Sequence, residues 1–182
     1  MTTVYFVRHA HSVYSKDELN RPLSEKGFLD AHNITQQLKQ IDIHAFYSSP
    51  YKRAIQTIEG IANLKGLSIK TIDALKERAL GIIQDNNFQQ AVQKVWDNPE
   101  LSFEGGESNK TAQQRAIDAF LYLLDCHMDK QIVIGTHGNI LTLILNYFDN
   151  NIGYEFWKDL QMPAIVKCCF QNNKMIHISL LC

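Results

Sequence analysis

The sequence predicts an α/β protein: a three-layer α/β/α sandwich with a mainly parallel central sheet and an antiparallel edge strand. Two observations support this fold class. Short apolar runs alternate with longer segments of helical periodicity along most of the 182 residues, a pattern typical of parallel sheets covered by helices. Two strand-like runs near the C-terminus flank Asn172-Asn173, and such a pair favours a hairpin that supplies the antiparallel edge.

The individual elements follow from runs and periodicities. We expect strands where three to seven residues form a mainly apolar or β-branched run, at residues 4–7, 45–47, 67–72, 132–134, 164–170 and 175–181. We expect helices where apolar residues recur three and four positions apart, at residues 24–41, 51–64, 88–96 and 110–127, and from the turn at His137 to about residue 147.

Capping residues support several of these boundaries. Ser24 is suited to cap the first helix, and Ser48-Ser49-Pro50 reads as a strand-to-helix turn before the second because Ser favours N-caps and Pro the first helical turn. Gly66 ends the second helix, since glycine is favoured just beyond a helix C-terminus. Asn98-Pro99 ends the third, which we place within a segment that is otherwise hard to interpret.

Composition indicates one domain over residues 1–182, with a lid or insertion region at about 81–108. The formal net charge of −1 argues against broad binding of nucleic acid or of an anionic membrane, both of which favour a basic surplus. The N-terminus lacks a long apolar stretch, and four cysteines show no CxxC spacing. We therefore expect a cytoplasmic protein with reduced thiols, and the sequence leaves its oligomeric state open.

Three strand-to-helix turns carry candidate catalytic side chains. Arg8 and His9 follow the first strand, Arg53 lies in the first turn of the second helix, and His137 follows the strand at 132–134. In a parallel sheet these turns lie at one edge, where open α/β sheets bind ligands. Guanidinium groups bind phosphate oxygens in a bidentate manner and stay charged. The set therefore predicts chemistry on a phosphoryl group.

A nucleophile and an acid complete the hypothesis. We expect His9 to attack phosphorus and form a covalent phosphohistidine, while Arg8, Arg53 and His137 stabilise the charge on the equatorial oxygens. Glu77 is the candidate for the acid that protonates the leaving group, and its surroundings should keep it protonated until then. A purely structural role remains open for each histidine, and His9-x-His11 leaves a metal site as an alternative.

Six ordered pieces of the chain match one known pattern, at residues 6–12, 22–27, 47–57, 77–78, 105–108 and 133–138. Together they resemble the histidine phosphatase superfamily, the phosphoglycerate-mutase-like proteins. The resemblance implies that His9 is phosphorylated, that Arg8, Arg53 and His137 form the phosphate pocket, and that Glu77 donates the proton. It implies no metal and no cofactor.

The resemblance also suggests substrate-binding positions, and the chain departs from the family's usual residues at two positions. Ser15, Arg78 and Gly138 are the additional candidates for contact with substrate. Ala10 stands where the family usually has Gly, and Ser15 where it often has Asn. The expected activity is metal-independent hydrolysis of a small-molecule phosphate monoester, because the region between Glu77 and residue 108 is short for a lid. A phosphoglycerate-type mutase and a non-catalytic phosphate-binding relative remain alternatives.

Overall fold

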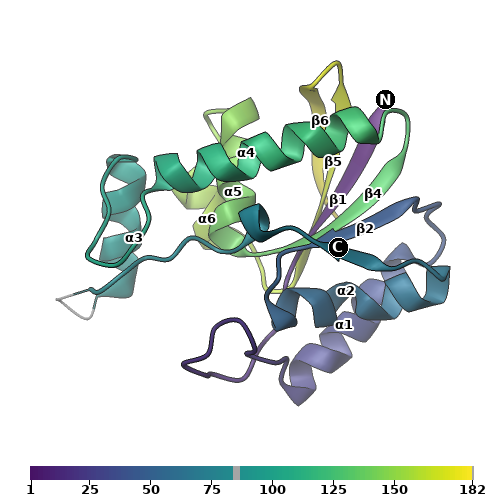
Figure 1. The fold of residues 1–182 in the computed structure, drawn as a ribbon, viewed down its shortest axis with the longest axis horizontal. Helices are drawn as coiled ribbons and strands as arrows, with labels where there is room; N and C mark the ends of the chain where they lie inside the picture. The colour runs from purple at the N-terminus through teal and green to yellow at the C-terminus, as the bar shows by residue number, and fades with distance from the viewer. Residues whose placement is uncertain (84–86, 182) are drawn as a thin grey trace.

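The computed structural model describes residues 1–83 and 87–181. One sheet contains the strands β1 (Thr2–Arg8), β2 (Ala45–Ser48), β3 (Ile69–Thr71), β4 (Gln131–Thr136), β5 (Ala164–Gln171) and β6 (Lys174–Leu181). Their order is β3-β2-β4-β1-β5-β6 (Figure 1). The first four run parallel to one another, whereas β5 pairs antiparallel with both β1 and β6. The predicted fold class is confirmed, and the predicted hairpin of β5 and β6 forms the edge beside β1.

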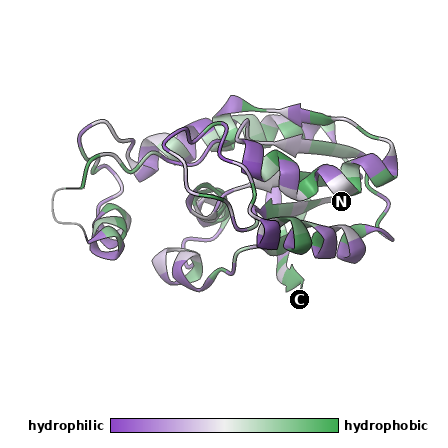
Figure 2. Ribbon diagram, turned by 90° about the horizontal axis from the view of Figure 1, so that it is seen from below, coloured by the Kyte–Doolittle hydropathy of each residue, from purple (hydrophilic) through white to green (hydrophobic). Residues whose placement is uncertain are grey.

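Helices cover both faces of this sheet (Figure 1). The helices α1 (Glu25–Leu38) and α2 (Lys52–Lys65) pack on one face, and α4 (Asn109–Cys126) and α5 (Gly138–Phe148) on the other. Figure 2 shows hydrophobic and hydrophilic residues interleaved along these helices, as expected where one side of a helix meets the core and the other meets water. Within the described residues, none of the helices is both long and apolar enough to traverse a lipid bilayer.

Alternation along β1 divides the core into two parts. Val4 and Phe6 pack with α4 and α5, whereas Tyr5 and Val7 pack with α1 and α2. All four side chains are buried because successive strand residues point to opposite faces and helices cover both. This explains why the run is apolar at every position rather than at every second one.

Most predicted helix boundaries agree with the structure to within three residues. The Ser24 side chain accepts a hydrogen bond from the Gly27 backbone N–H, and Gly66 adopts a left-handed conformation with φ of 65°. A Cβ atom on Gly27 would lie 2.0 Å from the His11 carbonyl oxygen, so only glycine lets α1 approach the loop that follows β1. Phe28, which shares the three- and four-residue spacing of the buried Ala31, Ile34 and Leu38, is exposed.

Two elements differ from the sequence-based expectation. The third strand is shorter than residues 67–72 and continues into a 3-10 helix, η1 (Asp73–Leu75). A short helix, α6 (Tyr154–Asp159), was not anticipated, because six residues are too few to show a helical repeat.

The region at about 81–108 lies beside the sheet rather than within a layer. It contains α3 (Phe88–Asp97), which stands apart from the central layers (Figure 1). The two loops that flank α3 are joined by backbone hydrogen bonds, from Ile82 N–H to the Glu104 carbonyl and from Glu107 N–H to the Ala79 carbonyl. Residues 84–86 of the predicted lid or insertion lie outside the described residues, and a lid function remains a prediction.

Candidate active site

The candidate catalytic side chains meet at the C-terminal ends of three neighbouring parallel strands. β1 lies beside β4, and β4 lies beside β2. His9 follows β1, His137 follows β4, and Ser49 follows β2. The backbone ties these turns together, because His9 N–H donates to the Thr136 carbonyl and Ser49 N–H to the Gly135 carbonyl, both at 2.9 Å. Chain segments that are far apart in sequence are therefore held in one place.

His9 presents one ring nitrogen for chemistry. Its Nδ1 lies 2.8 Å from the Ala10 carbonyl oxygen, to which it donates, so Nε2 carries a lone pair. Arg53 Nε–H donates to this Nε2 at 3.3 Å. Burial, together with the nearby Arg53 and Arg8, lowers the pKa of His9 to about 3 even though the bond to Ala10 opposes the change. The imidazole is thus neutral at ordinary pH, as a nitrogen nucleophile must be.

Arg53 is held from several sides in the first turn of α2. Only 4% of the residue is exposed. Its Nη1 donates to the Glu18 backbone carbonyl at 2.9 Å, and its Nη2 lies 3.0 Å from the Glu18 carboxylate. The guanidinium also lies over the ring of Tyr51, 4.7 Å from its centroid. These contacts fix the cation beside His9, so little side-chain entropy would be lost when it binds an anion.

Arg8 reaches the site from the last position of β1. Its Nη1 donates to the Leu160 carbonyl, and its Nε has no hydrogen-bond partner among the described residues. A Cβ atom on Gly138 would lie 3.1 Å from the Arg8 guanidinium carbon. The absence of a side chain at 138 therefore makes room for Arg8 at the start of α5.

His137 is fully buried at the N-cap of α5. Its ring centroid lies 5.2 Å from that of His9. Ser49 Oγ lies 2.7 Å from its Nε2 and also accepts a bond from Tyr51 N–H. If the serine hydroxyl donates to Nε2, the ring proton is on Nδ1, which has no partner within the described residues. Desolvation lowers the pKa of His137 well below 6.5, so it would meet an anion as a neutral N–H donor.

The Glu77 carboxyl group accepts three hydrogen bonds from backbone N–H groups. Its Oε2 accepts from Asn139 N–H at 3.0 Å, and its Oε1 accepts from Ile140 N–H and Arg78 N–H, each at 2.9 Å. The carboxyl group thus fills the N-terminus of α5, whose first N–H groups have no partner within the helix. The carboxyl group is thus surrounded by backbone N–H donors, and the role of Glu77 as the acid stays a prediction.

A cavity of about 650 Å³ opens over these groups. Arg8, His9, Arg53, Glu77 and Gly138 line it, as does Arg78. His137 lies beneath the lining, with its ring against His9. Ser15 is not among the lining residues, and its Oγ accepts a bond from Asp17 N–H instead. The structure therefore brings together seven of the eight candidates and places Ser15 elsewhere in the loop.

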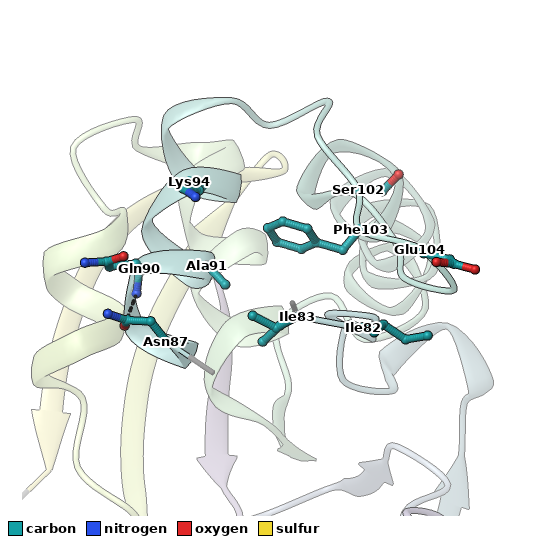
Figure 3. Close-up of a pocket in the computed structure, with 9 residues that line it drawn as sticks. All are labelled: Ile82, Ile83, Asn87, Gln90, Ala91, Lys94, Ser102, Phe103 and Glu104. Atoms are coloured by element: carbon teal, nitrogen blue, oxygen red, sulfur yellow. Dashed lines mark hydrogen bonds between the residues drawn. The ribbon is translucent and has the colours of Figure 1, made fainter. Parts of the chain in front are cut away.

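A second hollow, of about 380 Å³, lies on the other side of α3 (Figure 3). Ile83 and Phe103 face each other across it, next to Ala91 of α3 (Figure 3). It contains none of the candidate catalytic residues. Since α3 contributes Phe88 and Val92 to the catalytic cavity, this helix is a partition between the two spaces.

Several residues that line the cavity or support it from below were not found from the sequence. Glu18 and Arg21 lie in the irregular loop between β1 and α1, Ser49 supports His137, and Trp157 comes from the unanticipated α6. Of these residues, only Ser49 belongs to a pattern that the sequence analysis used, the Ser-Ser-Pro turn between a strand and a helix. The other three depend on a loop path and on a very short helix, neither of which leaves a periodic pattern in the sequence.

The His9-x-His11 spacing does not place both rings in the cavity. β1 ends at Arg8, so the alternation of a strand does not extend to these residues. His11 is exposed, with its Nδ1 2.8 Å from Ser24 Oγ. Among the described residues, no three His, Cys, Asp or Glu side chains are grouped as a metal site would require.

Known proteins share both the sequence pattern and the fold. The model of the histidine phosphatase superfamily (branch 1) matches residues 4–174. A putative phosphoserine phosphatase 2 of Hydrogenobacter thermophilus is 28% identical, over 100% of this chain and 97% of that protein. A probable phosphatase of Schizosaccharomyces pombe is 26% identical over 79% of this chain, which spans only 55% of that protein.

A solved structure has the same architecture. YhfR of Bacillus stearothermophilus superposes with a TM-score of 0.80 at 23% identity, covering 99% of this chain and 96% of that one. At this identity the likeness concerns the fold alone.

Proposed function

Because the chain belongs to the histidine phosphatase superfamily, we propose that it is a metal-independent phosphatase. It hydrolyses a small-molecule phosphate monoester through a covalent phosphohistidine on His9. One observation carries this proposal: the neutral His9 ring commits Nδ1 to the Ala10 carbonyl and directs Nε2 towards Arg53. This arrangement matches that of a nitrogen nucleophile beside a bound phosphoryl group.

The phosphoryl group would bind among the cations and the second imidazole. Arg8 and Arg53 supply guanidinium donors, and His137 supplies its Nδ1–H. Donors fixed before the reaction stabilise the charge that develops on the equatorial oxygens without reorganising. Arg78 remains a proposed substrate contact because it lines the cavity, and Gly138 remains one because it admits Arg8. For Ser15, contact with substrate stays a prediction.

The reaction proceeds in two displacements. His9 Nε2 forms a bond to phosphorus while the ester P–O bond breaks, and the alkoxide that leaves takes a proton from Glu77. Water then attacks phosphorus, the N–P bond breaks, and Glu77 accepts the proton of the water. Inorganic phosphate leaves, and both residues return to their starting state.

The hydrogen bonds suggest which oxygen of Glu77 carries the proton. Oε1 accepts two N–H bonds, whereas Oε2 accepts one. Each carboxyl oxygen has two lone-pair sites, so Oε2 keeps one free. We assign the transferable proton to Oε2, with Oε1 anchoring the group on α5.

Solvent access favours hydrolysis over transfer of phosphate to a second alcohol. The rim residues Glu18, Phe88 and Met162 are exposed. Water can therefore reach a phosphohistidine at His9, which a mutase must prevent.

The test is the release of inorganic phosphate from an aryl phosphate ester. His9→Ala should reduce turnover to the background rate, whereas His11→Ala, which changes an exposed histidine two residues away, should retain it. Rapid acid-free quenching should trap phosphate on the wild-type chain as an acid-labile adduct that His9→Ala lacks. Full turnover by His9→Ala, or complete loss of wild-type activity in chelator, would contradict the proposal.

A second experiment tests the role of Glu77 as the proton donor to the leaving group. Glu77→Gln should slow the hydrolysis of alkyl phosphates much more than that of activated aryl phosphates, since only the poor leaving groups need a proton. Equal losses on both classes would remove Glu77 from this role.

A further inference from the structure

The part of the cavity beyond the phosphate-binding groups has an apolar wall. We define this wall by five residues: Leu80, Phe88, Val92, Trp157 and Met162. They come from the loop after Glu77, from α3, from α6 and from the segment that precedes β5. Four segments that are separate in sequence thus place apolar side chains on one side of the site.

Two of these segments are in contact through aromatic rings. The centroids of Phe88 and Trp157 lie 6.4 Å apart with their planes at 47°. Phe88 and Val92 are four residues apart on α3 and therefore share one face of the helix. This face lines the catalytic cavity, while Asn87, Ala91 and Lys94 line the hollow on the other side (Figure 3). Phe88 and Val92 thus face the site together, whereas Ala91 lines the hollow.

Two of the five residues of the wall are exposed in the unliganded protein, whereas Val92 is buried. Phe88 is 59% exposed and Met162 is 38% exposed. When a ligand covers large apolar groups that contact water, the free energy of the complex falls, roughly in proportion to the area covered. A phosphate ion alone would bind among Arg8, Arg53 and His137 and leave the wall uncovered. The cavity of about 650 Å³ lies within the range of about 300–1,000 Å³ that is usual for sites of larger molecules.

On the phosphate side of the cavity, Arg53 and Arg21 have an acidic partner, whereas Arg8 Nε has no hydrogen-bond partner among the described residues. Glu18 is shared between Arg53 and Arg21, at 3.0 and 3.2 Å. Arg78 is the cation that remains for an anionic leaving group, and the wall itself presents no charged side chain. A carboxylate on a leaving alcohol that lies against the wall, away from Arg78, would lose water against apolar surface, which is unfavourable.

We propose that the alcohol portion of the substrate is apolar and that Phe88, Trp157 and Met162 bind it. The substrate class is then a phosphate monoester of an aromatic or long-chain alcohol. This inference rests on the proposed phosphatase function, and it assigns these three side chains a role in specificity rather than in bond breaking.

The experiment compares alkyl esters that need the same leaving-group protonation. Benzyl phosphate carries an apolar ring, glycerol 3-phosphate carries hydroxyls, and phosphoserine carries charges. We expect the wild-type kcat/KM for benzyl phosphate to exceed those for the other two by about 10-fold or more, the usual size of discrimination by an apolar pocket. Equal or higher values for glycerol 3-phosphate or phosphoserine would overturn the inference.

Substitutions in the wall should lower kcat/KM for the apolar ester and leave kcat/KM for the polar esters nearly unchanged. Phe88→Ala should lower kcat/KM for benzyl phosphate ~10-fold, mainly by raising KM, and should leave glycerol 3-phosphate nearly unchanged. Trp157→Ala should do the same, and Trp157→Phe, which keeps a ring, should lose less. Phe28→Ala is the matched control, because Phe28 is an equally exposed phenylalanine on α1, outside the cavity.

The outcomes separate this inference from the proposed function. If no ester releases phosphate, or if His9→Ala remains active, the phosphatase proposal itself fails. If all three esters are hydrolysed through His9 and Phe88→Ala lowers them equally, the phosphatase proposal stands and the apolar specificity is refuted.

Discussion

The carboxylate of Glu18 lies 3.0 Å from Nη2 of Arg53, the buried guanidinium whose Nε–H also donates to Nε2 of His9. An acidic side chain thus occupies a donor that the proposed reaction needs for a phosphoryl oxygen. Glu18 belongs to a loop that is fastened to α2, because its backbone carbonyl accepts from Arg53 and the Leu19 carbonyl accepts from Lys52 N–H. The carboxylate itself is about half exposed, so it can turn away when phosphate arrives.

Glu18→Gln should therefore tighten the binding of phosphate. Exposed ion pairs contribute about 0.2–1 kcal/mol, so we expect the inhibition constant of inorganic phosphate to fall by ~1.5- to 5-fold. The measurement is competitive inhibition against an aryl phosphate. Glu59→Gln, an exposed position on the outer part of α2, controls for the change in net charge. Weaker binding of phosphate to Glu18→Gln would show that the carboxylate supports the site rather than competing for it.

Ser49 should matter through His137. Its hydroxyl is 2.7 Å from His137 Nε2, and losing it would leave a fully buried ring nitrogen without a partner and its tautomer unfixed. We expect Ser49→Ala to lower kcat/KM by about 10-fold, on the basis of about 1–1.5 kcal/mol for one hydrogen bond. Ser48→Ala is the matched control, since Ser48 is also fully buried but its Oγ has no hydrogen-bond partner among the described residues. Equal effects of the two variants would count against a positioning role for Ser49.

Gly138→Ala should displace the Arg8 guanidinium. The added Cβ would lie 3.1 Å from Arg8 Cζ, closer than ordinary van der Waals contact, and the end of a flexible side chain can yield. We expect weaker phosphate inhibition and a kcat/KM reduced by several fold, with little change in thermal unfolding. In Gly153→Ala the new Cβ would meet Trp96 at 3.9 Å, an ordinary contact, so activity and stability should both be retained. A Gly138→Ala chain with full activity would show that Arg8 needs no such clearance.

The buried histidines should make the protein sensitive to acid. The pKa of His9 is lowered to about 3 by burial, whereas an unfolded histidine has a pKa of about 6.5. The folded state therefore binds fewer protons, and the stability present above pH ~6.5 is lost as the pH falls towards 3.

At pH ~4.5 the free energy of unfolding that is lost because of His9 is on the order of 2 kcal/mol. Urea unfolding at pH ~7 and ~4.5 should therefore show a smaller loss of stability for His9→Gln than for the wild type. His32→Gln, at an exposed position of α1, controls for the loss of a histidine as such. Identical losses for His9→Gln and wild type would mean that the folded protein tolerates a charged His9.

Residues next to regular strands could be located from the sequence alone. Arg8, His9 and His137 follow apolar runs that are buried on both faces, and the register of parallel strands brings their ends to one edge. Arg53 could be found because the Ser-Ser-Pro turn places it in the first turn of a helix. For these residues, position in the chain determines position in space.

Residues held by loops could not be located in this way. Glu18 reaches Arg53 because the loop after β1 closes on itself, with Val13 N–H bonded to the Pro22 carbonyl, and no periodic pattern encodes that path. The bonds from α5 to Glu77 likewise depend on how the segment after η1 crosses the sheet edge. Trp157 reaches the cavity from a helix of six residues, too short to be recognised by its repeat.

The position of β5 next to β1 has a consequence for biosynthesis. β1 lies between β4 and β5, so Arg8 at its end and His9 just after it are synthesised more than a hundred residues before these neighbouring strands. Arg8 also donates to the carbonyl of Leu160, just before β5. A nascent chain should therefore gain the ability to turn over substrate only after residues 164–171 have emerged, in one late step rather than gradually.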